Sequence, residues 1–370
     1  MIRPRRPGAV RGLVWVGVVV VLAFSALVTL FVIGLSTGPV ASLVGLLLAV
    51  LPVFPVAAAL LWLDRYEDEP PALLAFAFAW GATAAVVISL VFSIGSMIVI
   101  AGAGGSDALG AVVVAPVVEE SAKGLAIIGV LLIRRSQFNG VVDGIVYAGL
   151  SGLGFAFAEN ILYLGSAFLD GGITGAVLTF ILRCVMGPFA HPMFTAAFGI
   201  GVGLAVRART PGLKVLYPVL GLITAMCLHA LWNGMTLIGG LGSWFVGYVL
   251  LQVPIFAGFV GFAVVVRRRE ARLINEHLRV YAESGWITGQ ELAMLSSADG
   301  RRQARSWAAR VAGPQGKTAM RDFQELASEL SFLRERMANH AAPADAQRTE
   351  ADLLRSMWQL RLGFQPAPGR

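Results

Sequence analysis

The side chains of this 370-residue chain that could do chemistry begin with a charged cluster inside an apolar run. The stretch 115–130, APVVEESAKGLAIIGV, contains Glu119, Glu120 and Lys123, and the run around it is long enough to cross a membrane. A charge at bilayer depth costs from about 3 to more than about 10 kcal/mol, depending on the reference scale. Glu119 and Lys123 stand at i and i+4, so one interpretation is a structural ion pair on one helix face. The other is a functional site.

Three further apolar segments carry polar groups that could belong to the same site. Glu159 and Asn160 stand together in GFAFAENILY, and His191 lies in GPFAHPMFTAAFG. His229 and Asn233 are at i and i+4 in CLHALWNGM, so their side chains share a helix face. A single histidine in a membrane helix is often only an interhelical hydrogen-bonding residue. Two acidic sites and two imidazoles on four separate segments favour a chemical role.

Counting from the ends of the segments places these groups between the middle and the outer side of the membrane. We therefore expect four helices to bring them together in one polar, hydrated pocket. Two histidines and one glutamate form a known catalytic zinc set with an open position for water, and a further carboxylate is suited to act as general base. Arg183, near His191 in the sequence, is expected to neutralise a carboxylate or to extend toward the outer interface.

The amino-acid composition indicates that these residues belong to a membrane protein. The chain is 57% hydrophobic and 14% charged, whereas a soluble domain has about 25% charged residues. We predict an all-α, polytopic membrane protein. The net charge is +7, but basic residues precede the first span and follow the last, which is the positive-inside pattern and argues against nucleic-acid binding. Arginine greatly outnumbers lysine, which indicates a high-GC bacterial genome and hence the bacterial plasma membrane.

Eight apolar segments are long enough to cross about 30 Å of hydrocarbon. They are 13–34, 41–63, 72–101, 108–133, 141–165, 175–206, 215–239 and 244–266. With both termini cytoplasmic, the outer loops contain no lysine or arginine, so we predict that orientation. Pro116, Pro188 and Pro192 predict helix breaks close to the polar residues.

The predicted organisation has three parts. Residues 1–12 form a basic cytosolic N-terminus, 13–266 the transmembrane bundle, and 267–370 a soluble helical tail with amphipathic periodicity. The tail could pack on itself, lie along an anionic leaflet, or join two copies into a homo-oligomer.

The motifs, taken in order, resemble those of a known family. EESAK matches the pattern EExxK, FAFAE followed by Asn160 matches FxxxE, and His229 lies in an HxxxN pattern. Ahead of them, LWLDRYEDEPP (61–71) is similar to a DRYExEP stretch. Together they resemble the PrsW family of intramembrane proteases, relatives of the CAAX prenyl proteases and the bacteriocin-processing membrane enzymes. The resemblance covers about residues 55–240.

The resemblance implies a metalloprotease that cleaves membrane-associated proteins, with anti-sigma factors as the best-known substrate class. On this basis Glu159, His191 and His229 would hold a zinc ion or, without metal, the attacking water. One of Glu119 and Glu120 would take the proton from that water and return it to the leaving amine. Neighbouring residues on a helix point about 100° apart, so the sequence does not decide which of the two is the base.

Other residues take supporting roles in the same hypothesis. Lys123 would orient the second glutamate, and the amide of Asn233 or Asn160 would donate a hydrogen bond to the oxyanion. The wider superfamily more often has EExxxR and FxxxH, whereas this chain has Lys123 and Glu159. A metal-free glutamate protease, in which a glutamate and a histidine activate water directly, therefore stays open beside the zinc enzyme.

Two other classes of protein fit part of the pattern. Broken helices and mid-membrane carboxylates also suit a proton-coupled transporter, although we find no internal repeat in the chain. A non-enzymatic membrane scaffold could use buried polar groups only to fix its helix packing. The partners expected for the protease are a membrane protein substrate and the lipid bilayer.

Overall fold

The computed structural model describes residues 9–63, 69–102, 104–134, 138, 140–237, 240–339, 342 and 344–364. Within these residues the secondary structure is entirely helical, without a strand, so the prediction of an all-α fold is confirmed. The predicted basic N-terminus lies largely outside the described residues, as do residues 64–68 of the DRYExEP stretch.

The N-terminal half contains α-helices and two short π-helical segments. They are α1 (Ala9–Val50), α2 (Val53–Leu63), α3 (Pro71–Trp80), η1 (Gly81–Ala85), α4 (Val86–Gly102), α5 (Asp107–Leu109), η2 (Gly110–Val114) and α6 (Ala115–Arg134). The rest of the chain continues as α7 (Val141–Phe180), η4 (Ile181–Met186), α8 (Ala190–Val206), α9 (Pro211–Leu237), α10 (Gly240–Gly247), η5 (Tyr248–Gln252), α11 (Val253–Glu283), α12 (Gly289–Leu295), α13 (Ala298–Ala338) and α14 (Ala346–Leu362).

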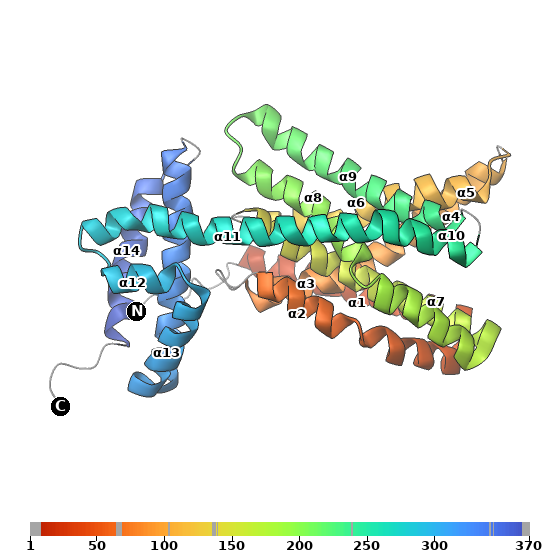
Figure 1. The fold of residues 1–370 in the computed structure, drawn as a ribbon, viewed down its shortest axis with the longest axis horizontal. Coiled ribbons are helices and arrows are strands. Elements are labelled where there is room, and N and C mark those ends of the chain that lie inside the picture. Colours follow the sequence, from red (N-terminus) through yellow and green to blue (C-terminus); the bar gives the residue numbers. More distant parts are fainter. Residues whose placement is uncertain are drawn as a thin grey trace.

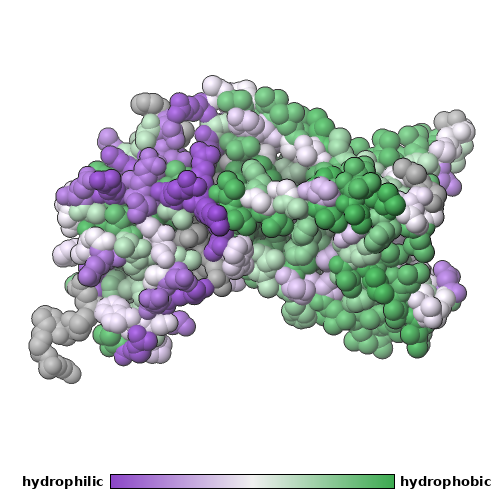
Figure 2. All heavy atoms as spheres, in the orientation of Figure 1, coloured by the Kyte–Doolittle hydropathy of each residue, from purple (hydrophilic) through white to green (hydrophobic). Residues whose placement is uncertain are grey.

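Five helical stretches of the described chain are long and apolar enough to cross a membrane. They are Gly12–Leu63, Pro71–Gly102, Val141–Val206, Pro211–Leu237 and Gly240–Glu283. Large apolar side chains cover the surface of the helical bundle, as the green spheres in Figure 2 show, and the purple hydrophilic residues gather over α12, α13 and α14. The chain is therefore a membrane protein.

The two longest of the five stretches far exceed the roughly 20 residues that one crossing needs. Gly12–Leu63 has 52 residues and Val141–Val206 has 66. Each is interrupted by a glycine with positive φ, 70° at Gly38 and 59° at Gly172, a conformation that other residues rarely adopt. Both glycines are in segments predicted as outer loops. The number of crossings stays a prediction.

Helix α7 forms the centre of the bundle, and α1, α3 and α8 pack along it (Figure 1). Its contact with α8 requires small residues, because a Cβ atom on Gly152 would lie 2.5 Å from the carbonyl oxygen of His191. Close approach of this kind is typical of helix packing in membranes. It fixes the position of His191 relative to α7.

The break predicted around Pro188 is present and positions a site residue. Helix η4 ends at Met186, and α8 begins at Ala190, so His191 lies in the first turn of a new helix. Pro116 lies in the first turn of α6, directly after the π-helical turn η2. Sequence analysis therefore located both irregularities correctly.

The C-terminal helices have a hydrophobic core of their own. Ile274, Leu278, Phe323, Leu330 and Met357 from α11, α13 and α14 pack together, away from the core of the bundle. Helix α11 runs without a break from the bundle into this group, so the predicted boundary at residue 266 falls within a continuous helix (Figure 1). The three-part division stays a prediction.

A buried carboxylic acid lies between α2 and α3, outside the membrane-spanning segments. Glu69 is 5% exposed, and the hydroxyl of Tyr147 donates a hydrogen bond to its Oε2 at 2.5 Å. Burial, together with the nearby Asp143 carboxylate, raises the pKa of Glu69 to about 9. This residue belongs to the DRYExEP stretch, and its contact with Tyr147 ties that stretch to α7.

Candidate active site

Lys123 joins the two glutamates of α6. Its Nζ donates to Oε1 of Glu120 at 2.8 Å and to Oε2 of Glu119 at 3.3 Å. The ammonium group also lies 3.9 Å from the centre of the Phe155 ring on α7. Lys123 and Glu120 are both fully buried. The predicted pair between Glu119 and Lys123 is therefore present, and Glu120 is the closer of its two partners.

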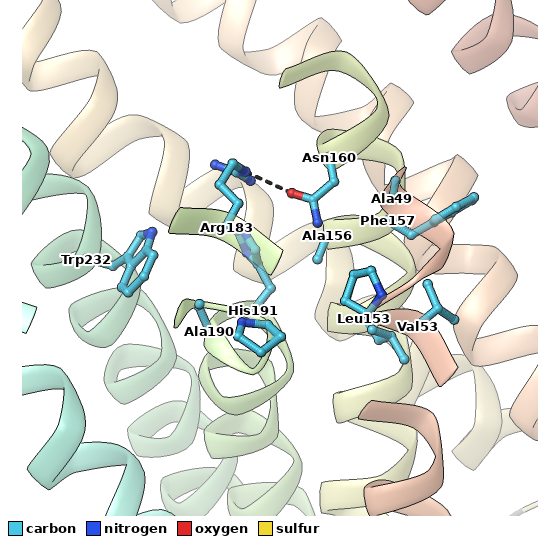
Figure 3. A pocket seen from close by; sticks show the side chains of 13 residues that line it. Ala49, Val53, Leu153, Ala156, Phe157, Asn160, Arg183, Ala190, His191 and Trp232 are labelled. Carbon is cyan, nitrogen blue, oxygen red and sulfur yellow. Dashed lines mark hydrogen bonds between the residues drawn. The ribbon is translucent and has the colours of Figure 1, made fainter. Parts of the chain in front are cut away.

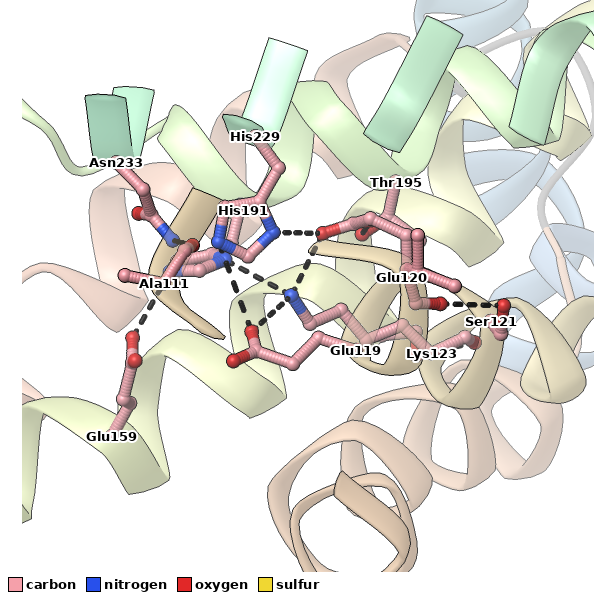
Figure 4. A network of polar contacts seen from close by, with 12 residues as sticks. Ala111, Glu119, Glu120, Ser121, Lys123, Glu159, His191, Thr195, His229 and Asn233 are labelled. Atoms are coloured by element: carbon pink, nitrogen blue, oxygen red, sulfur yellow. Dashed lines mark hydrogen bonds and ion pairs between the residues drawn. The ribbon is translucent and has the colours of Figure 1, made fainter. Parts of the chain in front are cut away.

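Glu120 is held on both oxygens by residues from three helices. Besides Lys123, it receives a hydrogen bond from Oγ1 of Thr195 at 2.8 Å, and Nδ1 of His229 lies 2.9 Å from its Oε1 (Figure 4). Because an ionised carboxylate only accepts hydrogen bonds, Nδ1 of His229 carries the proton. The lone pair of His229 is then on Nε2, which lies 3.8 Å from Oε2 of Glu119.

His191 lies between a cation and a carboxylate. Nζ of Lys123 is 3.0 Å from its Nδ1, and Oε2 of Glu159 is 3.0 Å from its Nε2. Since an ammonium group only donates, Nδ1 of His191 is the acceptor and Nε2 carries the proton. Each of the two imidazoles therefore has its N–H directed at a glutamate, His229 at Glu120 and His191 at Glu159.

Glu159 also forms an ion pair across the break before α8. Its Oε2 lies 2.5 Å from Nη2 of Arg183, whose Nε donates to Oδ1 of Asn160 at 2.8 Å. Figure 3 shows Arg183 and Asn160 directed at each other above His191. Arg183 thus neutralises a carboxylate, as the sequence suggested.

The structure brings most of the predicted site residues into one cluster. Figure 4 shows side chains from α6, α7, α8 and α9 converging in this network. Asn233 is in the same region, but its amide nitrogen donates to the carbonyl oxygen of Ala111 at 2.9 Å. To stabilise the oxyanion, as the sequence hypothesis suggested, the Asn233 amide would have to break its hydrogen bond to Ala111 and donate to the substrate instead.

A family model described as "PrsW family intramembrane metalloprotease" matches residues 69–259 of the chain. This segment contains the whole cluster, from Glu119 to His229, and it makes up more than half of the chain. The chain belongs to the PrsW family. The resemblance seen in the motifs is therefore confirmed, and the protein is an intramembrane protease.

Individual relatives agree with this assignment. Protease PrsW of Clostridioides difficile is 27% identical over 194 residues, which are 52% of this chain and 79% of the relative. Protease PrsW of Bacillus subtilis is 25% identical over 212 residues, 57% of this chain and 88% of the relative. Protease PrsW of Geobacillus kaustophilus is 30% identical over 142 residues, 38% of this chain and 58% of the relative. No solved structure matches the chain.

The metal ion implied by the family description has a suitable donor set in this PrsW-family site. Ligand atoms of Glu119, His191 and His229 all lie within 4.8 Å of one another. Two imidazoles and one carboxylate are the donors of a catalytic zinc site. The ammonium group of Lys123 lies close to Glu119 and His191, so a cation already contacts two of the three donors.

The grouped donors include Glu119, whereas the sequence hypothesis placed Glu159 with the two histidines. Within the described residues, the atoms that could hold a metal include Glu119 and not Glu159. Oε2 of Glu159 instead contacts Nε2 of His191 and Nη2 of Arg183. Glu119 is also the more open glutamate of α6, with 14% of its side chain exposed against 0% for Glu120.

Two hydroxyl groups of the site were not found by sequence reasoning. Thr195 donates to Glu120, and Oγ of Ser151 donates to the carbonyl oxygen of Lys123 at 3.0 Å. Thr195 is four residues after His191, so the two share a helix face, and that spacing was a usable signal. Ser151 has no comparable signal, because its partner is a backbone atom.

A small cavity lies beside His191 in the PrsW-family fold. It has a volume of about 20 Å³, and Asn160, Arg183 and Trp232 are among the residues that line it (Figure 3). This volume is enough for about one water molecule, and the polar groups of Asn160 and Arg183 could hold it. The site therefore has room for a water next to one of its imidazoles.

Proposed function

We propose that the chain hydrolyses peptide bonds of membrane proteins at a zinc site made by Glu119, His191 and His229. The observation that supports it is the grouping of these three donors, from α6, α8 and α9, within 4.8 Å inside an apolar helical bundle. A zinc ion bound there would lower the pKa of a bound water to about 7 and polarise the substrate carbonyl.

The remaining glutamates hold the imidazoles in position. Glu120 accepts a hydrogen bond from Nδ1–H of His229, and Glu159 accepts one from Nε2–H of His191. The other two nitrogens, Nε2 of His229 and Nδ1 of His191, keep their lone pairs for the metal. Such carboxylates fix the tautomer and orientation of metal-binding histidines. Glu159 lies beside Nε2, on the side of His191 away from the Nδ1 donor, so it acts through this imidazole and not on the water itself.

This proposal places Glu119 with the two histidines, where the motifs suggested Glu159. Lys123 supplies a positive charge to the acidic cluster, and Nδ1 of His191 must exchange this ammonium partner for the metal. Arg183 holds Glu159 in place by an ion pair.

A metal-free glutamate protease is the second candidate, and one observation favours it. Nζ of Lys123 already contacts both Glu119 and His191, where the zinc proposal needs the metal to bind. In this alternative Glu119 is the base that takes a proton from water, and His191 and His229 position that water. Membership of a protease family argues against the transporter and scaffold interpretations.

Metal analysis with a cleavage assay separates the two candidates. The purified full-length protein is dialysed against a chelator, and cleavage of a single-span reporter protein is measured before and after zinc is added. The zinc proposal expects about one bound zinc per chain and loss of at least 100-fold in rate on chelation, restored by zinc. Full activity at zero bound metal would support the metal-free alternative. No cleavage of any reporter by metal-loaded protein would contradict both.

We further propose eight membrane crossings with both termini in the cytoplasm of a bacterial cell. Gly12–Leu63 and Val141–Val206 would each cross twice, reversing at Gly38 and Gly172. Helix α6 adds the eighth crossing. It has 20 residues, and it differs from the apolar stretches because it contains four charged residues. Labels at positions 104 and 241 should then react from outside, and a label at 370 should not.

The substrates and partners follow from the same proposal. We infer a membrane protein as substrate, of the anti-sigma-factor type by family resemblance. The helices α12, α13 and α14 lie outside the family match, and association of two copies through them is a further expectation. Size measurement of the protein with and without residues 289–370 tests that association.

A further inference from the structure

A second cavity lies on the other side of the break before α8. Its volume is about 220 Å³, and it is bounded by η4 and the start of α8, by α9, and by η5 with the start of α11. The side chains that shape it are mainly large and apolar; they are Met186, Phe189, Trp232, Tyr248, Gln252 and Phe256. An apolar cavity of about 150 Å³ binds benzene, so this one can take an aromatic or branched aliphatic side chain.

This cavity adjoins the candidate active site. Gly187, Pro188, Ala190 and Trp232 line both it and the small cavity that contains His191. Trp232 also contacts Phe194 at 6.4 Å between ring centres, and Phe194 stacks on His229 at 5.4 Å. Trp232 and Ala190 therefore form a common wall between the large cavity and the two imidazoles.

Gln252 is a polar residue in the wall of this cavity. The residue is 4% exposed, and within the described residues its Nε2 has no hydrogen-bond partner. A buried donor without an acceptor is rare in folded proteins because it is costly. Gln252 also ends the π-helical segment η5, and π-helical turns inside α-helices are frequent at functional sites. Gln252 is therefore a lining residue with a donor that is available to an acceptor from outside the chain.

We propose that this cavity binds the substrate polypeptide next to the bond that is cut, an inference that rests on the proposed protease function. A large apolar side chain of the substrate fills the space between Trp232 and Phe256, and Nε2 of Gln252 donates to a neighbouring peptide carbonyl oxygen. A helical substrate has no free carbonyl in its interior, whereas an extended segment does. The site therefore selects an unwound segment with a large apolar residue beside the cut.

Tyr248 and Met186 keep the cavity open for such a segment. The hydroxyl of Tyr248 donates to the carbonyl oxygen of Met186 at 2.8 Å, which joins η5 to the end of η4. Phe189 and Phe256 contact each other at 5.2 Å between ring centres along the opposite wall. These two contacts hold the cavity walls in place.

The test uses the purified full-length protein and a single-span reporter that it cleaves. The residue next to the cut bond is replaced with Trp, Phe, Leu, Ala or Asp, and kcat/KM is measured for each reporter. We expect Phe and Leu to exceed Asp by at least tenfold. With Phe256→Ala, which enlarges the cavity, we expect a Trp reporter to gain about tenfold relative to Leu. Phe262→Ala is the matched control, because Phe262 is on the same helix, is 42% exposed and does not line the cavity.

The hydrogen bond is tested with Gln252→Met, which keeps the size of the side chain and removes the donor. We expect kcat/KM to fall about fivefold for every reporter, while the order of preference stays the same. Leu251→Met is the control, since Leu251 is exposed and adjacent. The inference is overturned if Phe256→Ala leaves the order of reporter preference unchanged. It is also overturned if the variant changes only the amount of phospholipid that purifies with the protein. In both cases the protein still cleaves reporters, so the proposed function is unaffected. If the wild-type protein cleaves no reporter at all, the proposed function fails first and this inference with it.

Discussion

Nζ of Lys123 lies 3.0 Å from Nδ1 of His191, although the two residues are 68 positions apart in the chain. The same ammonium group contacts Glu119 and Glu120, so one cation joins α6 to α8 through three acceptors. A charge buried in the membrane is stable only with such partners. The acidic pair of α6 and the imidazole of α8 are therefore parts of one electrostatic unit.

Removal of this cation should destabilise the bundle strongly. In Lys123→Met two carboxylates lose their buried counter-charge, and we expect the free energy of unfolding to fall by about 3–5 kcal/mol. Thermal unfolding in detergent measures the change. The double variant Lys123→Met with Glu120→Gln should recover part of the loss, because one of the stranded charges is then absent. A single variant as stable as the wild type would show that Lys123 is not needed as a counter-charge.

The same variant also bears on metal binding. If zinc binds Nδ1 of His191, an ammonium group at that nitrogen competes with it, so a folded Lys123→Met protein should bind zinc at least as tightly as the wild type. Direct titration with zinc, monitored by calorimetry, measures the affinity without any cleavage assay. A large loss of zinc affinity would indicate instead that Lys123 supports the donor set.

Glu119 and Glu120 should differ in what their loss does. Glu119→Gln removes a proposed ligand or base, so we expect cleavage to fall at least 1,000-fold and, in the zinc enzyme, bound zinc to be lost. Glu120→Gln removes the carboxylate that orients His229, and losses of this kind are typically 10- to 100-fold in metal affinity or activity. Cleavage rate and zinc content are measured on both variants. The reverse order of effects would assign the reacting role to Glu120.

Sequence analysis predicted the helices and the clustering, because both depend on composition and periodicity. The four segments that carry Glu119, Glu159, His191 and His229 do come together, and the break before His191 is in the expected place. Apolar length and proline position determine these features directly. A polar side chain within a membrane can also pair only with the few other polar side chains at that depth, which favours one common cluster.

The roles of individual residues could not be predicted in the same way. The choice between Glu119 and Glu120 depends on the rotation of α6, which Thr195 and His229 fix through Glu120. The position of Glu159 depends on Arg183, which reaches it across a break of irregular backbone. Both sets of contacts join different helical segments, so the spacing of residues within one segment does not predict them.

The stability of the protein should fall as the pH rises from about 5 to 9, in part because of Glu69. Its pKa is about 9 in the folded protein, against 4.5 for the ordinary side chain. The folded state therefore holds a proton that the unfolded state releases, so the stabilising effect is complete below pH 4.5 and lost as the pH passes 9. Asp143 and Glu270 act in the same direction on this carboxyl group, and the hydroxyl of Tyr147 opposes them.

Glu69→Gln isolates this contribution, since glutamine can still accept the hydrogen bond of Tyr147 but carries no titrating group. We expect the variant to unfold at a higher temperature than the wild type at pH 9 and at a similar temperature at pH 5. Melting temperatures in detergent at both pH values provide the measurement. An identical pH dependence in the two proteins would show that Glu69 titrates normally.

The contact between α7 and α8 should be required for the position of His191. In Gly152→Ala the added Cβ atom would meet the carbonyl oxygen of His191 at 2.5 Å, its carbonyl carbon at 2.7 Å and Cα of Pro192 at 2.9 Å. All three are backbone atoms, so the helices must separate, and we expect a loss of about 1–3 kcal/mol in stability. A displacement of about 1 Å at a reacting group can lower the rate about 100-fold. Gly171→Ala is the matched control on α7, because its Cβ atom would meet nothing within 4 Å. Equal melting temperatures and equal cleavage rates in the two variants would show that the site tolerates a shift of α8.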